Sequence, residues 1–252
     1  MKSTVLTNIY NEEYLLPMWL EHHKKIFDHG IIIDYWSTDN SVEICKKICP
    51  TWEVRTTKNK SFGAIEIDQE FMEIEKGLDG IKMILNTTEF LFVNKPLSDY
   101  FTKNEPESFA IEAYGPQSLQ KERPTTIKEL VNECLRPDVK YIFEYMRGHR
   151  NLHSFETGNY GLGRHSWYLP KTVIKDAVLL WTGYFPWNED MIKRKLQIRT
   201  HIPISDRERG YSYHHFWDLQ TLENIRIDNW NRGYKLIDIQ PNLFSMLQNY
   251  ST

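Results

Sequence analysis

Short apolar runs alternate with helical segments over residues 1–92, and this alternation limits the fold more than any other feature of the chain. Four runs have the branched, apolar composition of strands: 3–10, 30–36, 51–57 and 80–92. Helical periodicity fills the intervals at 16–27, 41–48 and 65–78. Strands that alternate with helices form a mostly parallel sheet. The sequence therefore predicts a Rossmann-like α/β fold with helices flanking the sheet.

Polar residues follow three of the four predicted strands. The stretches NIYNEE, DYWSTDNS and NTTEF lie where the first, second and fourth strands end or break. Parallel strands present their carboxyl ends at one edge of a sheet, where ligands of α/β proteins bind. The polar cluster 86–89 interrupts an apolar run, and buried polar groups cost free energy unless something binds them. We therefore predict a site of nucleotide size at this edge.

The second part of the chain is less regular. We expect strands at 108–115 and 139–146, a short helix at 125–135, and helices over 187–203 and 212–227. The sequence has no internal repeat or low-complexity tract between these segments. One domain with a less regular second half follows from this pattern.

The charge and composition of the chain argue against several classes of partner. A net charge of −3 and a pI near 6.3 give no reason to expect nucleic acid or an anionic membrane. No run of about 18 apolar residues predicts a transmembrane segment. Cys45 and Cys49 have no nearby histidine, so we interpret them as reduced core thiols, which indicates a cytoplasmic protein. An aromatic content of 13% suits stacking on sugars or bases.

Three stretches in order carry a family resemblance: TNIYNEEYLLPMWLEHHKKI, IIIDYWSTDNSVEI and MILNTTEFLF. Together they resemble the GT-A glycosyltransferases, in particular the family 2-like branch related to family 92. The resemblance covers residues 3–92 well and 158–216 more loosely. It implies a single GT-A domain in which residues 1–105 bind a nucleotide sugar and residues 106–252 form the acceptor-binding and catalytic half.

The resemblance also implies an activity. The chain would transfer a sugar, with inversion, from a nucleotide-diphosphate sugar, with a UDP-sugar favoured, to a glycan or lipid-linked acceptor. The alternative is a nucleotide-sugar or glycan-binding protein that keeps the fold with reduced catalysis. A nucleotidyltransferase is a weaker alternative, since it needs a glycine-rich, basic loop after the first strand and NIYNEEY has neither feature.

Two loops of the family contact the nucleotide, and both have counterparts here. The first corresponds to Thr7, Asn8, Asn11 and Glu12, whose amide and carboxylate groups suit base edges or ribose hydroxyls. In this loop, Asn11 could instead shape a turn.

The second nucleotide loop contains Asp34 and Asp39. Asp34 ends a buried strand, where an unpaired carboxylate would be costly, so we favour a ligand or hydrogen-bond role for it. Asp39 has an alternative role as the cap of the helix at 41–48.

The family's metal-binding sequence D-x-D-E-F is altered in this chain. Asn86 and Thr88 stand in place of the two aspartates, which in the family hold Mg²⁺ or Mn²⁺ against the donor diphosphate, and Glu89 alone keeps a charge. Hard divalent cations prefer anionic oxygen ligands. Three alternatives follow: a metal held through Glu89, donor phosphates and a histidine such as His214; cations and amides that stabilise the leaving group without metal; or reduced activity.

The catalytic base is expected in the second half. Glu189 and Asp190 resemble the family's acidic pair, and we choose Asp190 as the base; the alternative is that both acids complement a helix dipole. His165 follows the glycines of 158–163 and is a candidate for the donor-sugar site, although lone histidines are more often structural. The basic run at 193–199 predicts a solvated helix face with one member turned inward.

Overall fold

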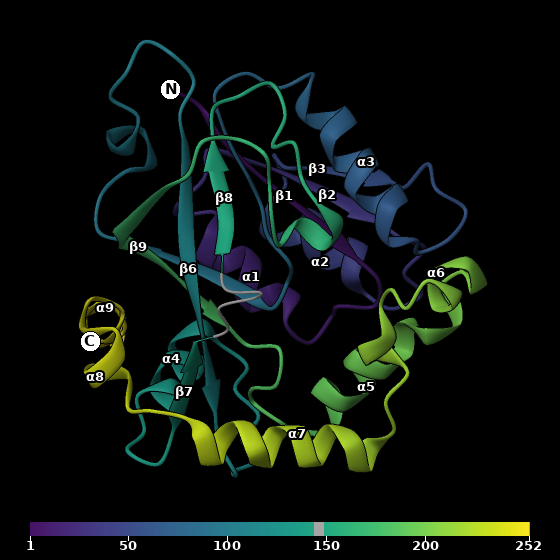
Figure 1. Ribbon diagram of the computed structural model, residues 1–252, viewed down its shortest axis with the longest axis vertical. Helices are drawn as coiled ribbons and strands as arrows, with labels where there is room; N and C mark the ends of the chain where they lie inside the picture. The colour runs from purple at the N-terminus through teal and green to yellow at the C-terminus, as the bar shows by residue number, and fades with distance from the viewer. Residues whose placement is uncertain (144–148, 252) are drawn as a thin grey trace.

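The structure, a computed structural model, describes residues 1–143 and 149–251. Its strands form one mixed sheet in the order β3-β2-β1-β4-β8-β6-β9-β5, with β7 paired to β6 (Figure 1). The strands are β1 Ser3–Ile9, β2 His29–Asp34, β3 Glu53–Thr56, β4 Ile81–Ile84, β5 Glu89–Val93, β6 Ser108–Gln117, β7 Lys140–Phe143, β8 His149–His153 and β9 Thr172–Trp181.

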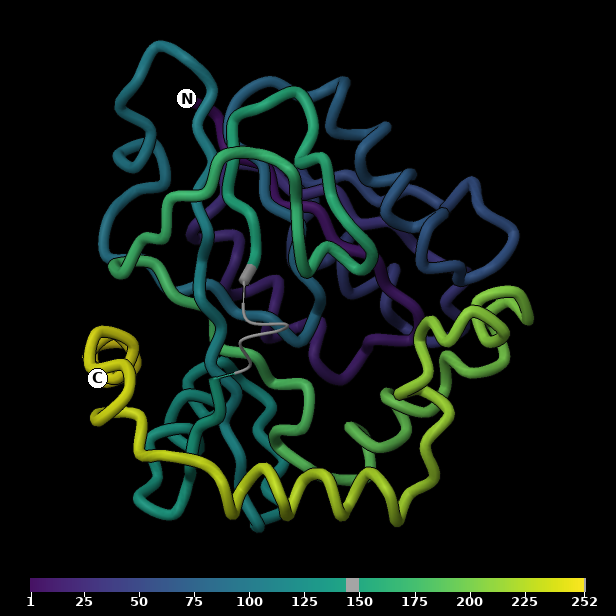
Figure 2. The backbone as a smooth tube through the Cα atoms, in the orientation of Figure 1, coloured from purple at the N-terminus to yellow at the C-terminus, as the bar shows by residue number. Residues whose placement is uncertain are grey.

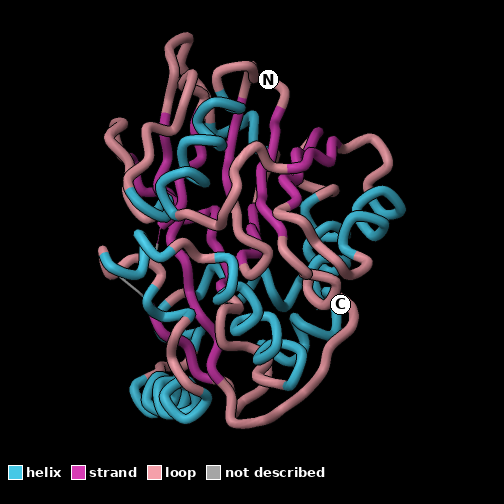
Figure 3. The backbone as a smooth tube through the Cα atoms, turned by 90° about the vertical axis from the view of Figure 1, so that its right-hand side faces the viewer, coloured by secondary structure: helices cyan, strands magenta, loops and turns pink. Residues whose placement is uncertain are grey.

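The parallel part of the sheet confirms the predicted alternation. β1 pairs in parallel with β2 and β4, and β2 pairs with β3. The connecting helices are α1 Leu16–His23, α2 Ser41–Ile48 and α3 Ala64–Glu75. Pro17 lies in the first turn of α1, where its missing N–H and fixed φ are tolerated. Helices lie on both sides of the strands (Figure 3).

The strand predicted at 80–92 is wrong as a single element. β4 ends at Ile84, residues 86–88 turn, and the chain resumes as β5 from Glu89. β5 then pairs antiparallel with β9 at the opposite end of the sheet from β3. Met83 and Phe90 are both fully buried, so the apolar runs on both sides resembled one strand, and the polar cluster between them is the turn.

The second half contains the elements α4 Ile127–Cys134, α5 Glu189–Gln197, α6 Ile204–Glu208, α7 Leu219–Arg232, α8 Leu236–Ile239 and α9 Pro241–Ser251, with 3₁₀ turns η1 Leu97–Tyr100, η2 Leu162–Arg164, η3 Ile198–His201 and η4 Tyr213–His215. The helix predicted over 212–227 begins later, because Ser212 has φ 55° and Asp218 caps α7 by accepting from the Thr221 N–H. The predicted strand 139–146 begins at Lys140, and its residues 144–146 lie outside the described residues. In the described part of the chain, no helix is long and apolar enough to cross a membrane.

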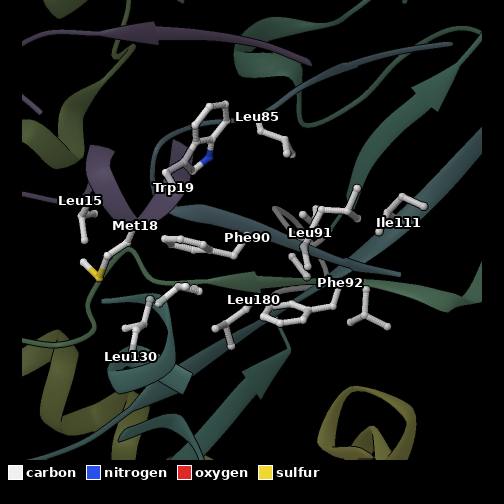
Figure 4. Packing of buried hydrophobic residues seen from close by; sticks show 14 of the residues in the cluster. Leu15, Met18, Trp19, Leu85, Phe90, Leu91, Phe92, Ile111, Leu130 and Leu180 are labelled. Carbon is white, nitrogen blue, oxygen red and sulfur yellow. The ribbon is translucent and has the colours of Figure 1, made fainter. Parts of the chain in front are cut away.

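Two apolar clusters stabilise the sheet. The larger joins α1 to β5 and β9, and Figure 4 shows Phe90 near Met18 and Trp19, with Phe92 near Leu91 and Leu180. The smaller contains Phe71 of α3 with residues of β1 and β2. The chain also folds back on itself: the segment with α5 lies beside the loop after β1 (Figure 2), where Gln197 donates to the carbonyl of Tyr10, 187 residues away in sequence.

Side chains of α1 hydrogen-bond the outer edge of β5, at the end of the strand order. Trp19 Nε1 donates to the Glu89 carbonyl (3.0 Å), and His22 Nε2 donates to the Leu91 carbonyl (2.6 Å). His23 Nε2 accepts from the Leu91 N–H (3.2 Å). An open strand edge leaves unpaired N–H and C=O groups, and here a helix supplies their partners.

Both histidines of α1 are held neutral. Each is almost fully buried, and burial lowers the pKa of His22 to about 4 and that of His23 well below its usual range. The hydrogen bonds agree, because the Leu91 N–H requires an unprotonated Nε2 on His23, whose Nδ1 donates to the Trp19 carbonyl (2.9 Å). Uncharged groups of α1 thus fix the outer edge of β5 at its start.

Candidate functional site

A cavity of about 260 Å³ opens where β1 and β4 end. The turn at 86–89 forms one wall, the loop after β1 a second, and the second half of α5 with η4 a third. Seven residues singled out from the sequence line it: Asn8, Glu12, Asn86, Thr88, Glu89, His165 and His214. The polar cluster of the sequence therefore faces a cavity at the edge where α/β proteins bind ligands.

Glu89 is bound by an arginine from β8. Arg150 Nε donates to Glu89 Oε2 (3.0 Å) and Arg150 Nη2 to Oε1 (2.5 Å), and both side chains are 4% exposed. The backbone and side-chain amides of Asn86 donate to the same two oxygens, at 2.8 and 3.3 Å. A forked pair of this kind is strong and directional. Both carboxylate oxygens of Glu89 are therefore already hydrogen-bonded by the chain itself.

A second arginine binds the first residue of the turn. Arg164, at the end of η2, donates to the Asn86 side-chain carbonyl (3.1 Å) and to Asp68 of α3 (2.5 Å). The Gly163 N–H donates to the other Asp68 oxygen (2.6 Å), and Gly163 has φ 69°, which glycine adopts without strain. Burial raises the pKa of Asp68, and Arg164 opposes that shift. η2 is thereby tied to α3 beneath the cavity.

A third arginine binds the middle of the turn. Arg194 of α5 donates through Nη2 to Thr87 Oγ1 (2.9 Å) and through Nε to Glu12 (2.5 Å). Burial raises the pKa of Glu12, with Arg194 acting against it. The basic run of α5 was predicted to turn one member inward. Arg194 does so, Lys195 also lines the cavity, and Lys193 is exposed.

Four predicted nucleotide residues bridge or underlie the first two loops, outside the cavity lining. Asn11 has φ 51° and accepts the Thr38 N–H (2.7 Å). Asp34 accepts from the Ser37 N–H (3.0 Å), and Asp39 accepts from the backbone of both loops. Thr7 is fully buried within β1. These side chains shape the edge of the site. The alternative of a turn fits the contacts of Asn11. For Asp39 the alternative of a helix cap is wrong in its position, because the N-cap of α2 is Asn40 and Asp39 accepts from the Ser41 N–H from one residue earlier.

Two orphaned polar atoms lie at the end of β1. Within residues 1–143 and 149–251, the side-chain oxygens of Thr7 and Asn8 are buried without a hydrogen-bond partner. Asn8 lines the cavity. Because a buried acceptor without a donor costs free energy, the Asn8 carbonyl marks a place where a ligand N–H or O–H would be stabilised.

The predicted catalytic acids do not line the cavity. Asn188 caps α5 by accepting from the Met191 N–H (3.0 Å), which puts Glu189 and Asp190 in the first helical turn. Glu189 is exposed, and Asp190 forms an ion pair with Arg123. In their place, the carboxylates that the described cavity lining contains are Glu12, Asp68 and Glu89.

The two predicted cavity histidines lie on different walls. His165 Nδ1 accepts from Arg150 Nη1 (2.9 Å), and because a guanidinium only donates, this nitrogen carries no proton. His214 lines the cavity from η4, with its ring 4.2 Å from that of His215. Among the residues that the structure describes, no three His, Cys, Asp or Glu side chains converge as metal ligands. With Glu89 bound by Arg150, the side chains present do not fit a divalent metal site.

Sequence reasoning missed Arg150 and Asp68. Asp68 carried a usable signal, because it lies next to Ile67 and three residues before Phe71, on the apolar face of α3. A carboxylate on a buried helix face needs a partner. Arg150 carried no such signal, since its partner Glu89 is 61 residues away in sequence.

The similarities to known proteins are distant. No model of a known protein family matches the chain, and no curated protein does. S. aureus TarS 1–349 matches all of this chain over 88% of its own length, with 11% identity and a TM-score of 0.42. The same protein with UDP-GlcNAc matches 48% of this chain over 39% of its own, with 20% identity and a TM-score of 0.33.

A second similar protein is glucosyl-3-phosphoglycerate synthase from Mycobacterium tuberculosis, in complex with Mn²⁺, UDP and glucosyl-3-phosphoglycerate. It matches 60% of this chain over 56% of its own, with 13% identity and a TM-score of 0.35. In this match and in that to the longer TarS structure, the chain spans 56% and 23% of the other protein. All these TM-scores are below 0.5, so the similarities do not determine the chemistry of this chain. That chemistry depends on the residues of its own cavity.

Proposed function

We propose that this chain is a glycosyltransferase that binds a nucleoside-diphosphate sugar, with UDP as the favoured nucleotide, in the cavity at the carboxyl ends of β1 and β4. The observation that carries the proposal is the convergence of three arginines on the turn 86–89 at this edge. In the order of motifs along the chain, the same turn occupies the place of the family's diphosphate-binding sequence. A glycan or lipid-linked molecule is the proposed acceptor.

The charge of the cavity suits a diphosphate. Its described lining holds the cations Arg150, Arg164, Arg194 and Lys195 against the carboxylates Glu12, Asp68 and Glu89, an excess of one positive charge before the histidines are counted. Guanidinium and ammonium groups bind phosphate oxygens by charge-assisted hydrogen bonds. The unpartnered Asn8 carbonyl at the end of β1 can accept from a base or a ribose hydroxyl.

An aromatic part of the cavity lining suits a sugar ring. Trp181 lines the cavity, and two lining glycines, Gly115 and Gly183, stand against its ring. A Cβ at Gly183 would lie 2.3 Å from the indole, and one at Gly115 would lie 2.8 Å from it. Any larger residue at either position would displace the indole. Aromatic faces of this kind stack on apolar sugar faces.

Asp190 stays the proposed base for an inverting transfer, but it forms an ion pair with Arg123 and does not line the cavity. It would have to leave Arg123 and turn toward the cavity to take the acceptor proton. The alternative, a binding protein with reduced catalysis, is favoured by one observation. Each carboxylate in the described cavity lining is already paired with an arginine.

A donor panel separates the two. We expect UDP-sugars to bind by titration calorimetry and to release UDP when an acceptor mixture is added. Binding without any release in the presence or absence of Mn²⁺ would assign the protein to the binding class. If no nucleotide sugar of the UDP, GDP, ADP or CDP series binds, the proposed function fails.

A further inference from the structure

The turn 86–89 lies where the family it resembles has a metal-binding sequence. Its side chains are not suitable ligands for a divalent metal ion. Asn86 offers a neutral carbonyl that Arg164 already occupies, and Glu89 has both oxygens bound by Arg150 and Asn86. Thr88 engages Thr182 through its backbone carbonyl. Hard divalent cations select anionic oxygens that are free to coordinate.

The same turn is the meeting point of three guanidinium groups. Arg150 comes from β8, Arg164 from η2 and Arg194 from α5, and each donates to a different residue of the turn. Arg residues remain protonated at every physiological pH and carry five N–H donors in a fixed fork. The contacts of Arg194 to Glu12 and Thr87 use its Nε and Nη2. Its side chain is 18% exposed, against 4% for Arg150 and 8% for Arg164.

We propose that arginine side chains, in place of a divalent metal ion, supply the positive charge that faces the donor diphosphate. Arg194 contacts the phosphates, and Arg150, paired with Glu89, fixes the turn that positions Arg194. In this arrangement Glu89 holds a guanidinium where the family sequence it resembles holds a metal ion. The inference rests on the proposed function, because it concerns the diphosphate of the same donor. It makes nucleotide binding independent of added divalent metal.

The test is the affinity of the wild-type chain for UDP, measured by titration calorimetry in EDTA and again in Mn²⁺. We expect binding in EDTA, with a dissociation constant within about threefold of that in Mn²⁺. Binding that is lost in EDTA and restored by Mn²⁺ overturns the inference while leaving the proposed function in place. Absence of binding in both conditions, for UDP, GDP, ADP and CDP alike, overturns both.

Mn²⁺ alone provides a second readout, independent of activity. Free Mn²⁺ gives a sharp electron paramagnetic resonance signal that broadens on binding. We expect the protein without nucleotide to leave this signal unchanged. A stoichiometric loss of signal that Glu89→Gln abolishes would show a metal site at the turn and contradict the inference.

Matched arginine variants test the role of the fork. Arg194→Lys and Arg150→Lys keep a positive charge and lose the planar fork, and we expect each to weaken UDP binding about tenfold in EDTA. Arg136→Lys makes the same change at a surface arginine that pairs with Glu122, Glu133 and Asp138, and should leave the affinity unchanged. Thermal unfolding of each variant shows whether the fold is kept. Equal affinities for all three folded variants would remove the arginines from diphosphate binding.

Discussion

The cavity face and the rear edge of β5 fix the same short segment by different chemistry. On the cavity face, the Glu89 carboxylate is paired with the Arg150 guanidinium, with both side chains 4% exposed. On the rear edge, the Glu89 carbonyl accepts from the Trp19 indole, and Leu91 is bound by two neutral histidines. The cavity face is charged and borders the ligand space, whereas the rear edge is uncharged and packed in the core.

The difference shows that the contacts that hold β5 in place are distinct from the charged groups that border the cavity. A buried ion pair contributes little net stability but makes each partner costly to remove, because a charge is then left unpaired. Neutral hydrogen bonds within an apolar cluster hold the strand without presenting charge to the cavity. The bonds at the rear edge thus position the backbone of Glu89. On the cavity face, the carboxylate of Glu89 then holds Arg150 in place. The predictions below separate the two faces.

The largest effect is expected from breaking the charged face. Arg150→Ala leaves Glu89 buried without its partner and should lower the free energy of unfolding by about 3–5 kcal/mol. Urea denaturation measures this. Arg136→Ala removes a surface arginine whose side chain is 30% exposed, and should cost no more than about 1 kcal/mol. Similar losses for the two variants would mean that the Arg150 pair is not desolvated.

The rear edge should respond to acid. The pKa of His22 falls from 6.5 to about 4 on folding, so the unfolded chain binds its proton first as the pH drops. The His22 contribution is present above pH 6.5, and about 3 kcal/mol of it is lost as the pH falls from 6.5 to 4. His23 adds to the loss in the same direction.

Denaturation at several pH values checks this expectation. His22→Gln keeps a donor for the Leu91 carbonyl and removes the titrating ring, so its stability should fall less steeply between pH 6.5 and 4. A variant with the same steepness as the wild type would show that the ring is not held neutral.

The sequence predicted what depends on local pattern. The alternation of strands and helices placed β1 to β4, α2 with identical bounds, and the polar loops that border the cavity. It noted the polar cluster at 86–89 but missed that the cluster separates two strands, because both flanks are equally apolar and the strand partner of β5 lies in β9. The pairing of Glu89 with Arg150 was missed for the same reason, since it joins segments distant in sequence. The histidines of α1 gave no sign that they would bind a strand edge.

A smaller effect separates two residues of the turn. Glu89→Gln weakens the hold on Arg150 and should lower kcat/KM for a UDP-sugar about tenfold. Thr88→Ala should change it less than about threefold, since Thr88 bonds Thr182 through its backbone carbonyl, which the substitution keeps. Steady-state UDP release measures both variants. Equal and negligible effects would remove this turn from the function.

The smallest change in stability is expected at α5. Asp190→Asn breaks an ion pair whose Arg123 partner is 64% exposed, so the free energy of unfolding should change by less than about 1 kcal/mol. The same variant examines the proposed base. A loss of turnover of a hundredfold or more at unchanged UDP affinity supports Asp190 as the base, and unchanged turnover rejects it.

A crystal structure grown with UDP and Mn²⁺ tests the central claim most directly. The account predicts the diphosphate in the cavity, within hydrogen-bond distance of Arg194, with Arg150 still forked on Glu89 and no metal density beside that carboxylate. Mn²⁺ coordinated by Glu89, with Arg150 displaced from it, would contradict the account.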